Sequence, residues 1–103
     1  MIFVFEVTIR PGHSAEAYAE AWIEASRYLQ QATGARGTRL HRKIGEPDKL
    51  LAIASWDSKA ERDEMESRQP EAAKRIIAEQ AAFVEVRVVG EYEDPEWLVE
   101  PHT

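Results

Sequence analysis

The sequence predicts an α+β protein with the ferredoxin-like order β-α-β-β-α-β, in which helices cover one face of a four-stranded antiparallel sheet. Three observations predict it. Residues 2–10 and 83–89 alternate apolar and polar side chains, which is typical of strands with one buried face. Residues 34–58 read as a β-hairpin with a basic first strand and an apolar second strand. Between these strands, apolar residues at three- and four-residue spacing predict amphipathic helices.

The first half of the chain gives one strand and one helix. Phe3, Phe5 and Val7 form the apolar face of the first strand, and a Pro-Gly pair ends that strand. Ser14 is a good N-cap, because its hydroxyl can accept a hydrogen bond from the first turn of a helix. We expect this helix to run to about Ala32.

The second half gives the hairpin, a second helical region and the last strand. We expect the hairpin turn in residues 45–49. Ser58 and Glu61 match a Ser-x-x-Glu capping box at the start of a helix, and Pro70 suits a point where the helix restarts. Together with the first strand, one face of the last strand should supply the apolar surface beneath the helices, through Val84, Val86 and Val88.

The opposite face of the predicted sheet mixes apolar and polar residues. Its apolar members are too large a group to leave in water: Ile2, Val4, Phe83 and Val89. Its polar members are Glu6, Thr8, Arg39, His41, Glu85 and Arg87. We therefore expect two sheets to pack together in a homodimer and to leave a polar pocket between them.

The composition separates a body from a tail. The chain has 103 residues and a net charge of −6, and residues 91–103 contain five acidic residues with no Lys or Arg, which leaves −1 for residues 1–90. We predict a single domain over residues 1–90 and an acidic C-terminal tail over residues 91–103. Trp97, Leu98 and Val99 make this tail too apolar for simple disorder, so we expect it to act as a dimer arm.

Several classes of protein are disfavoured. The absence of cysteine excludes disulfides and a thiolate nucleophile. No apolar run approaches the roughly 20 residues that span a bilayer, and residues 1–10 do not resemble a signal peptide, so we expect no membrane partner and a cytoplasmic location. His13 and Glu16 lack a third ligand nearby, which predicts no metal site. The nearly neutral body predicts no nucleic-acid partner.

The chain resembles the antibiotic biosynthesis monooxygenase family of the dimeric α+β barrel superfamily in three features. They are the order of elements, the segment EVTIRPG at the end of the first strand, and the segment WDS that leads from the third strand into a helix. The resemblance covers residues 1–90 and implies homodimers whose sheets face each other. Some members oxidise phenols or quinols with molecular oxygen and no cofactor, and others degrade haem. The helix PEAAKRIIAEQ lacks the histidine that haem degradation requires. Many members place a histidine on the helix after the WDS tryptophan, and this chain has none there.

The resemblance and the residues together give a candidate site. His41 is the candidate base, because the pKa of histidine lies close to working pH, and Glu6 could orient it or act itself. Arg39 or Arg87 could hold a phenolate, and an aromatic substrate could stack on two aromatic residues. The predicted substrate-binding residues are Arg39, Trp56, Phe83, Arg87 and Thr8. The sequence leaves open which face of the third strand looks into the pocket.

The leading prediction is a monooxygenase without a cofactor that acts on a small phenol, quinol or polyketide-like aromatic. The alternatives are a non-catalytic dimer that binds a small molecule or is purely structural, and an isomerase of the same superfamily. The charged residues also have a simpler interpretation. They could be cross-strand ion pairs, or they could protect an edge strand from aggregation.

Overall fold

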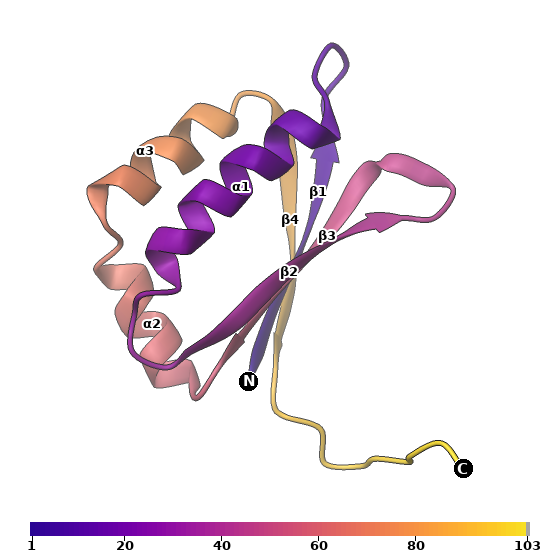
Figure 1. The fold of residues 1–103 in the computed structure, drawn as a ribbon, viewed down its shortest axis with the longest axis vertical. Helices are drawn as coiled ribbons and strands as arrows, with labels where there is room; N and C mark the ends of the chain where they lie inside the picture. The colour runs from indigo at the N-terminus through magenta and orange to yellow at the C-terminus, as the bar shows by residue number, and fades with distance from the viewer. Residues whose placement is uncertain (103) are drawn as a thin grey trace.

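The computed structural model describes residues 1–102 and has the predicted ferredoxin-like architecture (Figure 1). Thr103, the last residue of the predicted tail, lies outside the described residues. The sheet has the order β2-β3-β1-β4, and every neighbouring pair of strands is antiparallel. The elements are β1 (Ile2–Ile9), α1 (Ala15–Leu29), β2 (Ala35–Lys43), β3 (Glu46–Trp56), α2 (Lys59–Ser67), α3 (Glu71–Gln80) and β4 (Val84–Tyr92).

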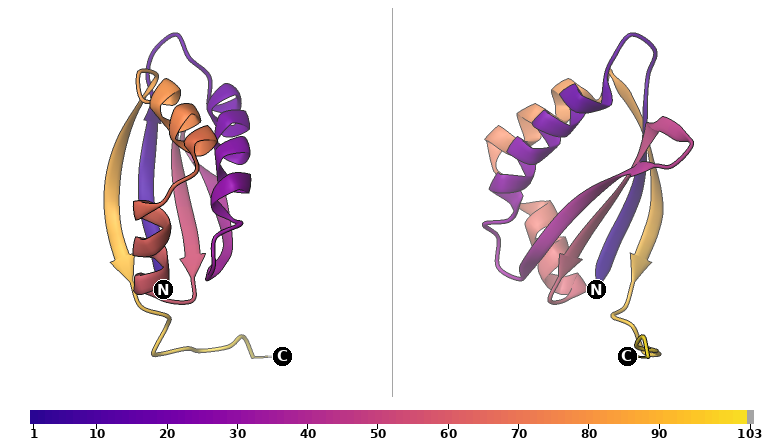
Figure 2. Two further views of the ribbon diagram at one scale, coloured as in Figure 1. Left: turned by 90° about the vertical axis from the view of Figure 1, so that its left-hand side faces the viewer. Right: turned by 45° about the vertical axis from the view of Figure 1, so that its right-hand side comes forward.

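All three helices lie on the same side of the sheet, and α1 packs against α3 (Figure 2). No helix or strand within residues 1–102 covers the other side of the sheet, and we call it the open face. The predicted alternation explains this arrangement. Val7 pairs with Leu50 on β3 and with Val86 on β4, so these three side chains share the helix side. Val7 is completely buried there, at the centre of the core.

The caps of the helices follow the sequence in part. The Ser14 hydroxyl accepts the Ala17 N–H at 3.1 Å, and the Ser58 hydroxyl accepts the Glu61 N–H at 3.2 Å, as predicted. The reciprocal half of the capping box is missing. Glu61 Oε2 is buried without a hydrogen-bond partner among the described residues, because its carboxylate packs against Gly34 instead. Pro70 occupies the N-cap position of α3, without a side-chain hydrogen bond, which confirms that the helix restarts at this point.

Three boundaries differ from the predictions. Helix α1 ends at Leu29, and the turn that follows it is tighter, because the N–H groups of Gln31 and Ala32 donate to the carbonyl groups three residues back. Strand β3 begins at Glu46, so the hairpin turn consists of Ile44 and Gly45, and this glycine has a φ of 87°. Strand β4 continues to Tyr92 through an irregularity opposite the Val4–Phe5 step, where one extra residue is accommodated.

Candidate active site

A cavity of about 360 Å³ lies between the helices and the covered face of the sheet. This volume is within the range of roughly 300–1,000 Å³ that is usual for small-molecule sites. Most of its wall is apolar, and much of that wall is aromatic. The aromatic residues are Phe3, Phe5, Tyr18, Trp22 and Trp56.

The register of β3 settles the question that the sequence left open. Ala54 and Trp56 line the cavity, so the face with Leu50, Ala52, Ala54 and Trp56 points toward the helices. Trp56 ends an inner strand of the sheet and is only 2% exposed, and α2 begins at Lys59, shortly after it, on the same side of the sheet. The prediction that Trp56 forms a wall of the pocket is consistent with this position.

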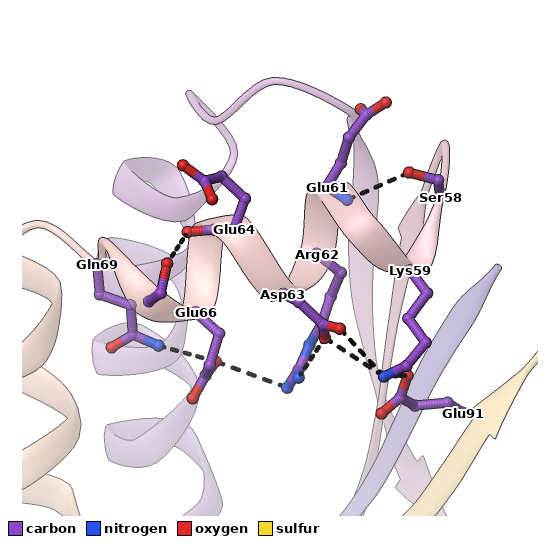
Figure 3. A network of polar contacts seen from close by, with 10 residues as sticks. Ser58, Lys59, Glu61, Arg62, Asp63, Glu64, Glu66, Gln69 and Glu91 are labelled. Carbon is purple, nitrogen blue, oxygen red and sulfur yellow. Dashed lines mark hydrogen bonds and ion pairs between the residues drawn. The ribbon is translucent and has the colours of Figure 1, made fainter.

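Two charged residues line the cavity, and both belong to α2. Arg62 and Glu66 are four residues apart, so they lie on the same face of the helix. The Arg62 guanidinium carbon lies 4.2 Å from the centre of the Phe3 ring. On the same helix, Arg62 Nη2 lies 3.6 Å from Glu66 Oε2 (Figure 3). The Arg62 side chain is 16% exposed and that of Glu66 is 52% exposed. The cation therefore lies on the inner side and the carboxylate nearer to solvent.

Neutral polar groups complete the lining. Gln69 Nε2 donates to Glu66 Oε2 at 3.2 Å, and the Thr38 hydroxyl donates to the Ile53 carbonyl at 3.3 Å. Burial raises the pKa of Tyr18 to about 12, so this side chain stays a neutral phenol at working pH. The site therefore offers one cation and one carboxylate in a wall that is otherwise neutral.

The cavity opens toward strand β4. Three apolar residues that line it are also substantially exposed: Ile77 at 45%, Val86 at 57% and Val88 at 59%. They come from α3 and from β4, which is an edge strand of the sheet. We call Ile77, Val86 and Val88 the apolar rim. A flat apolar ligand could pass over this rim without displacing charged side chains.

Most of the predicted site residues lie on the open face instead. Arg39 pairs with Ile53, His41 with Leu51, and Glu6 with Arg87, in positions that alternate with the cavity-lining residues. Thr8 follows Glu6 on the same face of β1. The structure brings Glu6 and Arg87 together, with Oε1 and Nη2 3.6 Å apart. It does not bring any of these residues to Trp56.

Glu6 and His41 flank one residue of β3. Both pair with Leu51, from β1 and β2 respectively, so their strands are separated by the full width of β3. Two strand spacings of about 4.8 Å put their backbones roughly 10 Å apart. His41 is exposed, and no hydrogen bond or ion pair holds it among residues 1–102. Within one chain, Glu6 is therefore not placed to orient His41.

Phe83 lies outside the strand on which the sequence placed it. Its N–H donates to the Gln80 carbonyl at 2.9 Å, which holds it in the turn after α3. Its ring stacks on His13, with the ring centres 4.4 Å apart. Phe83 lines a second cavity of about 430 Å³ near the start of α1, and Tyr18, Gln80 and Val84 line both this cavity and the main one.

Sequence reasoning missed Arg62 and Glu66. Helix α2 has no fully buried residue and is strongly charged, so its composition is that of a solvated helix. The available signal was the pair of opposite charges at i and i+4, shortly after the tryptophan that ends β3.

The described residues contain no group of three His, Asp or Glu side chains that could hold a metal ion. None of the helices in residues 1–102 is both long enough and apolar enough to cross a membrane.

The comparisons with known proteins agree with this geometry. The family model for "Antibiotic biosynthesis monooxygenase" matches residues 1–79 of the chain. A search of curated proteins finds no match. Because the family match spans α2 and most of α3, it includes Trp56, Arg62 and Glu66.

Several solved structures share the fold. A point mutant of SnoaB, a cofactor-independent oxygenase from Streptomyces nogalater, superposes with a TM-score of 0.81 at 14% identity, over 96% of each chain. A structure described as an antibiotic biosynthesis monooxygenase gives a TM-score of 0.69 at 18% identity, over 92% of this chain and 100% of the other. A Pseudomonas aeruginosa protein gives 0.65 at 18% identity, over 89% and 93%. At these identities the likeness establishes the fold.

Proposed function

The chain belongs to the antibiotic biosynthesis monooxygenase family, and from this premise we propose that it is a cofactor-independent monooxygenase. Its substrate would be a small phenol, quinol or polyketide-like aromatic, bound in the cavity between the helices and the sheet. The observation that carries the proposal is the aromatic-lined cavity with the Arg62 guanidinium in its wall. The likeness to SnoaB, described as a cofactor-independent oxygenase, supports it.

The wall of the cavity favours a flat aromatic ligand. Trp56 and the other aromatic residues offer faces and edges for stacking, which adds to the free energy of burial. A ligand that is already anionic when it binds would lose the hydration of its charge against this apolar wall, and one cation alone would compensate for that loss. A phenol or quinol loses less, because it is neutral when it enters and needs a cation only after one hydroxyl ionises.

Oxidation without a cofactor requires that the substrate itself supply the electrons. The phenolate form is electron-rich and can transfer an electron to molecular oxygen, after which carbon and oxygen combine to give a peroxide. Loss of water from that peroxide leaves a carbonyl at the attacked carbon, so a phenol and one O₂ give a quinone and one H₂O. Arg62 would stabilise the phenolate and the peroxide anion. Glu66, the carboxylate in the lining, would accept the phenol proton and give it to the peroxide anion. It would then take the proton of the attacked carbon as the carbonyl forms and give it to the leaving hydroxide, which completes the water.

His41 and Glu6 remain a second candidate for proton transfer, with Arg39, Arg87 and Thr8 around them. This alternative requires the open face to form a pocket of its own against a second copy. We propose such a homodimer through the open face, because exposed apolar residues occur there among the charges. Tyr92, which pairs with Ile2 on that face, is 50% exposed.

The decisive experiment is oxygen consumption by metal-free protein with menadiol and simple quinols as substrates. We expect uptake by the wild type and at least a tenfold lower rate for Arg62→Met, which keeps an unbranched apolar stem and removes the guanidinium and its charge. His41→Ala should keep most of the rate. A loss of activity in His41→Ala with Arg62→Met unaffected would move the chemistry to the open face.

The alternative without catalysis is tested by the same samples. If the wild type consumes no oxygen with any quinol but still binds menadione in the cavity, the chain is a binding protein rather than an oxygenase. An isomerase would consume no oxygen and would rearrange its substrate. Mass spectrometry with chromatography would then detect a new product with the same mass as the substrate.

A further inference from the structure

Tyr18 carries a hydroxyl that no other group within residues 1–102 binds. The residue is 9% exposed, and burial alone raises its pKa, without a contribution from any hydrogen bond. Buried tyrosine hydroxyls usually have a partner, because a polar group that leaves water without a new hydrogen bond destabilises the fold. The partner of this hydroxyl should therefore be a molecule that enters the space beside it.

The space beside Tyr18 can admit a ligand. Tyr18 lines both the main cavity of about 360 Å³ and the second cavity of about 430 Å³. Among the fully buried side-chain oxygens and nitrogens of residues 1–102, only Glu61 Oε2 lacks a partner. The Tyr18 hydroxyl also lacks a partner, so it is not enclosed by packed protein and borders the open space of these cavities.

Tyr18 and Arg62 lie at opposite ends of the main cavity, which both of them line. Arg62 lies over the ring of Phe3, near the start of β1. Tyr18 packs in the core with Val7 and Val84, near the end of that strand. Because a strand rises about 3.4 Å per residue, the backbones of Phe3 and Val7 are roughly 14 Å apart. Figure 1 shows the same arrangement, with α2 beside the start of β1 and the first turn of α1 near its end.

The two ends of the cavity differ in charge. Arg62 and Glu66, the two charged residues of the lining, both lie on α2, so the end at Tyr18 is neutral. The polar residues there are Tyr18 and Gln80, which line both cavities. A neutral donor in an apolar wall suits a carbonyl or ether oxygen. It does not suit an anion, because no cation at this end compensates for the lost hydration of a charge.

We propose that Tyr18 determines specificity by donating a hydrogen bond to a neutral oxygen at the end of the ligand that lies farthest from Arg62. The inference rests on the phenol or quinol oxidation proposed above and adds a second recognition element of that substrate. This element is a carbonyl or ether oxygen across the ring system from the reacting hydroxyl.

The second contact fixes the direction in which a flat ligand lies. Stacking against aromatic walls does not distinguish the two ends of a ring system, because both ends present similar faces. A ligand bound in the reverse direction would place its neutral oxygen beside Arg62 and would offer no proton to Glu66. The Tyr18 hydroxyl would favour the productive direction, in which the phenolic hydroxyl lies beside these two residues.

Calorimetric titration with two related ligands tests the proposal. The first ligand, 2-naphthol, has one hydroxyl, and the second, 6-hydroxy-2-naphthaldehyde, adds a carbonyl at the opposite end of the same ring system. Tyr18→Phe removes the hydroxyl of the protein and keeps its ring. We expect Tyr18→Phe to weaken binding of the aldehyde about fivefold and to leave binding of 2-naphthol within a factor of about two, because one neutral hydrogen bond is lost with the aldehyde alone.

The matched control is Tyr28→Phe. Tyr28 lies on the same helix, is 38% exposed and does not line the main cavity, so this change should alter neither affinity. Equal losses for the two ligands in Tyr18→Phe would mean that Tyr18 contributes packing alone. Unchanged binding of the aldehyde would mean that the hydroxyl does not reach the ligand. Either result would overturn the proposal.

The direction of the ligand is tested by a second substitution at the other end. Arg62→Met should weaken both ligands, because both carry the hydroxyl that Arg62 holds. In a chain with Arg62→Met and Tyr18→Phe, the two losses of aldehyde affinity should add, because contacts at separate ends of a ligand are independent. A combined loss no larger than either single loss would contradict the proposed direction.

Oxygen uptake by the same samples separates this inference from the proposed function. If the wild type consumes oxygen with quinols and Tyr18→Phe does not discriminate between the two naphthols, the oxygenase remains and the role of Tyr18 fails. If Tyr18→Phe discriminates and no quinol supports uptake, the role of Tyr18 in binding remains and the oxygenase fails. If the wild type binds neither ligand, the role of Tyr18 is wrong whatever the uptake shows.

Discussion

The guanidinium of Arg62 lies over the ring of Phe3, with its central carbon 4.2 Å from the ring centre. This contact joins α2 to β1, and it places a cation in the wall of the cavity. The planar guanidinium can stack on the ring and still direct N–H groups toward Glu66 and a ligand. A lysine ammonium could not do both.

Arg62→Lys should therefore destabilise the protein although it keeps the charge. We expect a loss of about 1 kcal/mol in the free energy of unfolding, the size of a partly buried cation–π contact, measured by urea denaturation. Arg68→Lys is the matched control, because Arg68 follows the same helix, is 79% exposed and pairs with Glu64 alone. Equal losses for the two variants would show that the stack on Phe3 contributes nothing.

Gly34 should tolerate substitution less well than Gly12. Both have a positive φ, 87° and 88°, so alanine is strained at either position. A Cβ at Gly34 would also collide with the Glu61 carboxylate, whereas a Cβ at Gly12 meets nothing. We expect Gly12→Ala to cost about 1 kcal/mol and Gly34→Ala at least about 1 kcal/mol more, by thermal or urea unfolding. Glu61→Ala should recover part of the cost of Gly34→Ala. Additive effects of the two substitutions would rule out the collision.

Tyr18 should make the stability of the protein depend on alkaline pH. Its folded pKa is raised from 10.0 to about 12 by burial, so the folded state favours the neutral phenol. The contribution of this group is therefore complete below pH 10 and is lost as the pH rises through the folded pKa of about 12. The wild type should lose roughly 2 kcal/mol more than Tyr18→Phe over this window. Parallel pH curves for the two proteins would show that Tyr18 is not buried in this way.

Glu16 should titrate at a lower pH than an ordinary glutamate. Its Oε1 accepts a hydrogen bond from Arg42 Nη2 at 2.7 Å, and this bond lowers the Glu16 pKa below its usual value of 4.5. The stabilising effect of the pair is present above that value and is lost as the pH falls through the folded pKa. NMR titration of the Glu16 carboxyl should show the lowered pKa in the wild type and an ordinary one in Arg42→Gln. The same pKa in both proteins would contradict the link between α1 and β2.

The sequence predicted the sheet well because alternation along a strand is a local property. Val7 and Val86 were assigned to the helix side from their own strands alone, and the register confirms both. The caps Ser14 and Ser58 are local as well, and both form. Boundaries were less accurate because the last turn of a helix changes its backbone bonds without a clear signal in the sequence, as after Leu29, where the bonds run to the third residue back.

The candidate site was harder to predict because it depends on which helix residues pack against each face of the sheet. Trp56 lines the cavity, which is consistent with its predicted role, but His41 and Glu6 alternate with the cavity-lining residues and point to the other side. Whether they have a role depends on a second chain. Arg62 was overlooked because a helix rich in charge gives no sign of which charge turns inward.

The central claim is that the ligand binds between the helices and the sheet. A chain with Trp22→Phe and Trp97→Phe retains Trp56 as its single tryptophan, and quenching of its fluorescence by menadione reports binding near that residue. Ala54→Leu fills the cavity, and Ser55→Leu adds the same side chain to the adjacent residue on the open face. We predict that Ala54→Leu weakens menadione binding at least tenfold and that Ser55→Leu leaves it within a factor of about two, since ~1.4 kcal/mol corresponds to tenfold in affinity. Unchanged binding in Ala54→Leu, with binding lost in Ser55→Leu, would contradict the account and place the ligand on the face that carries His41.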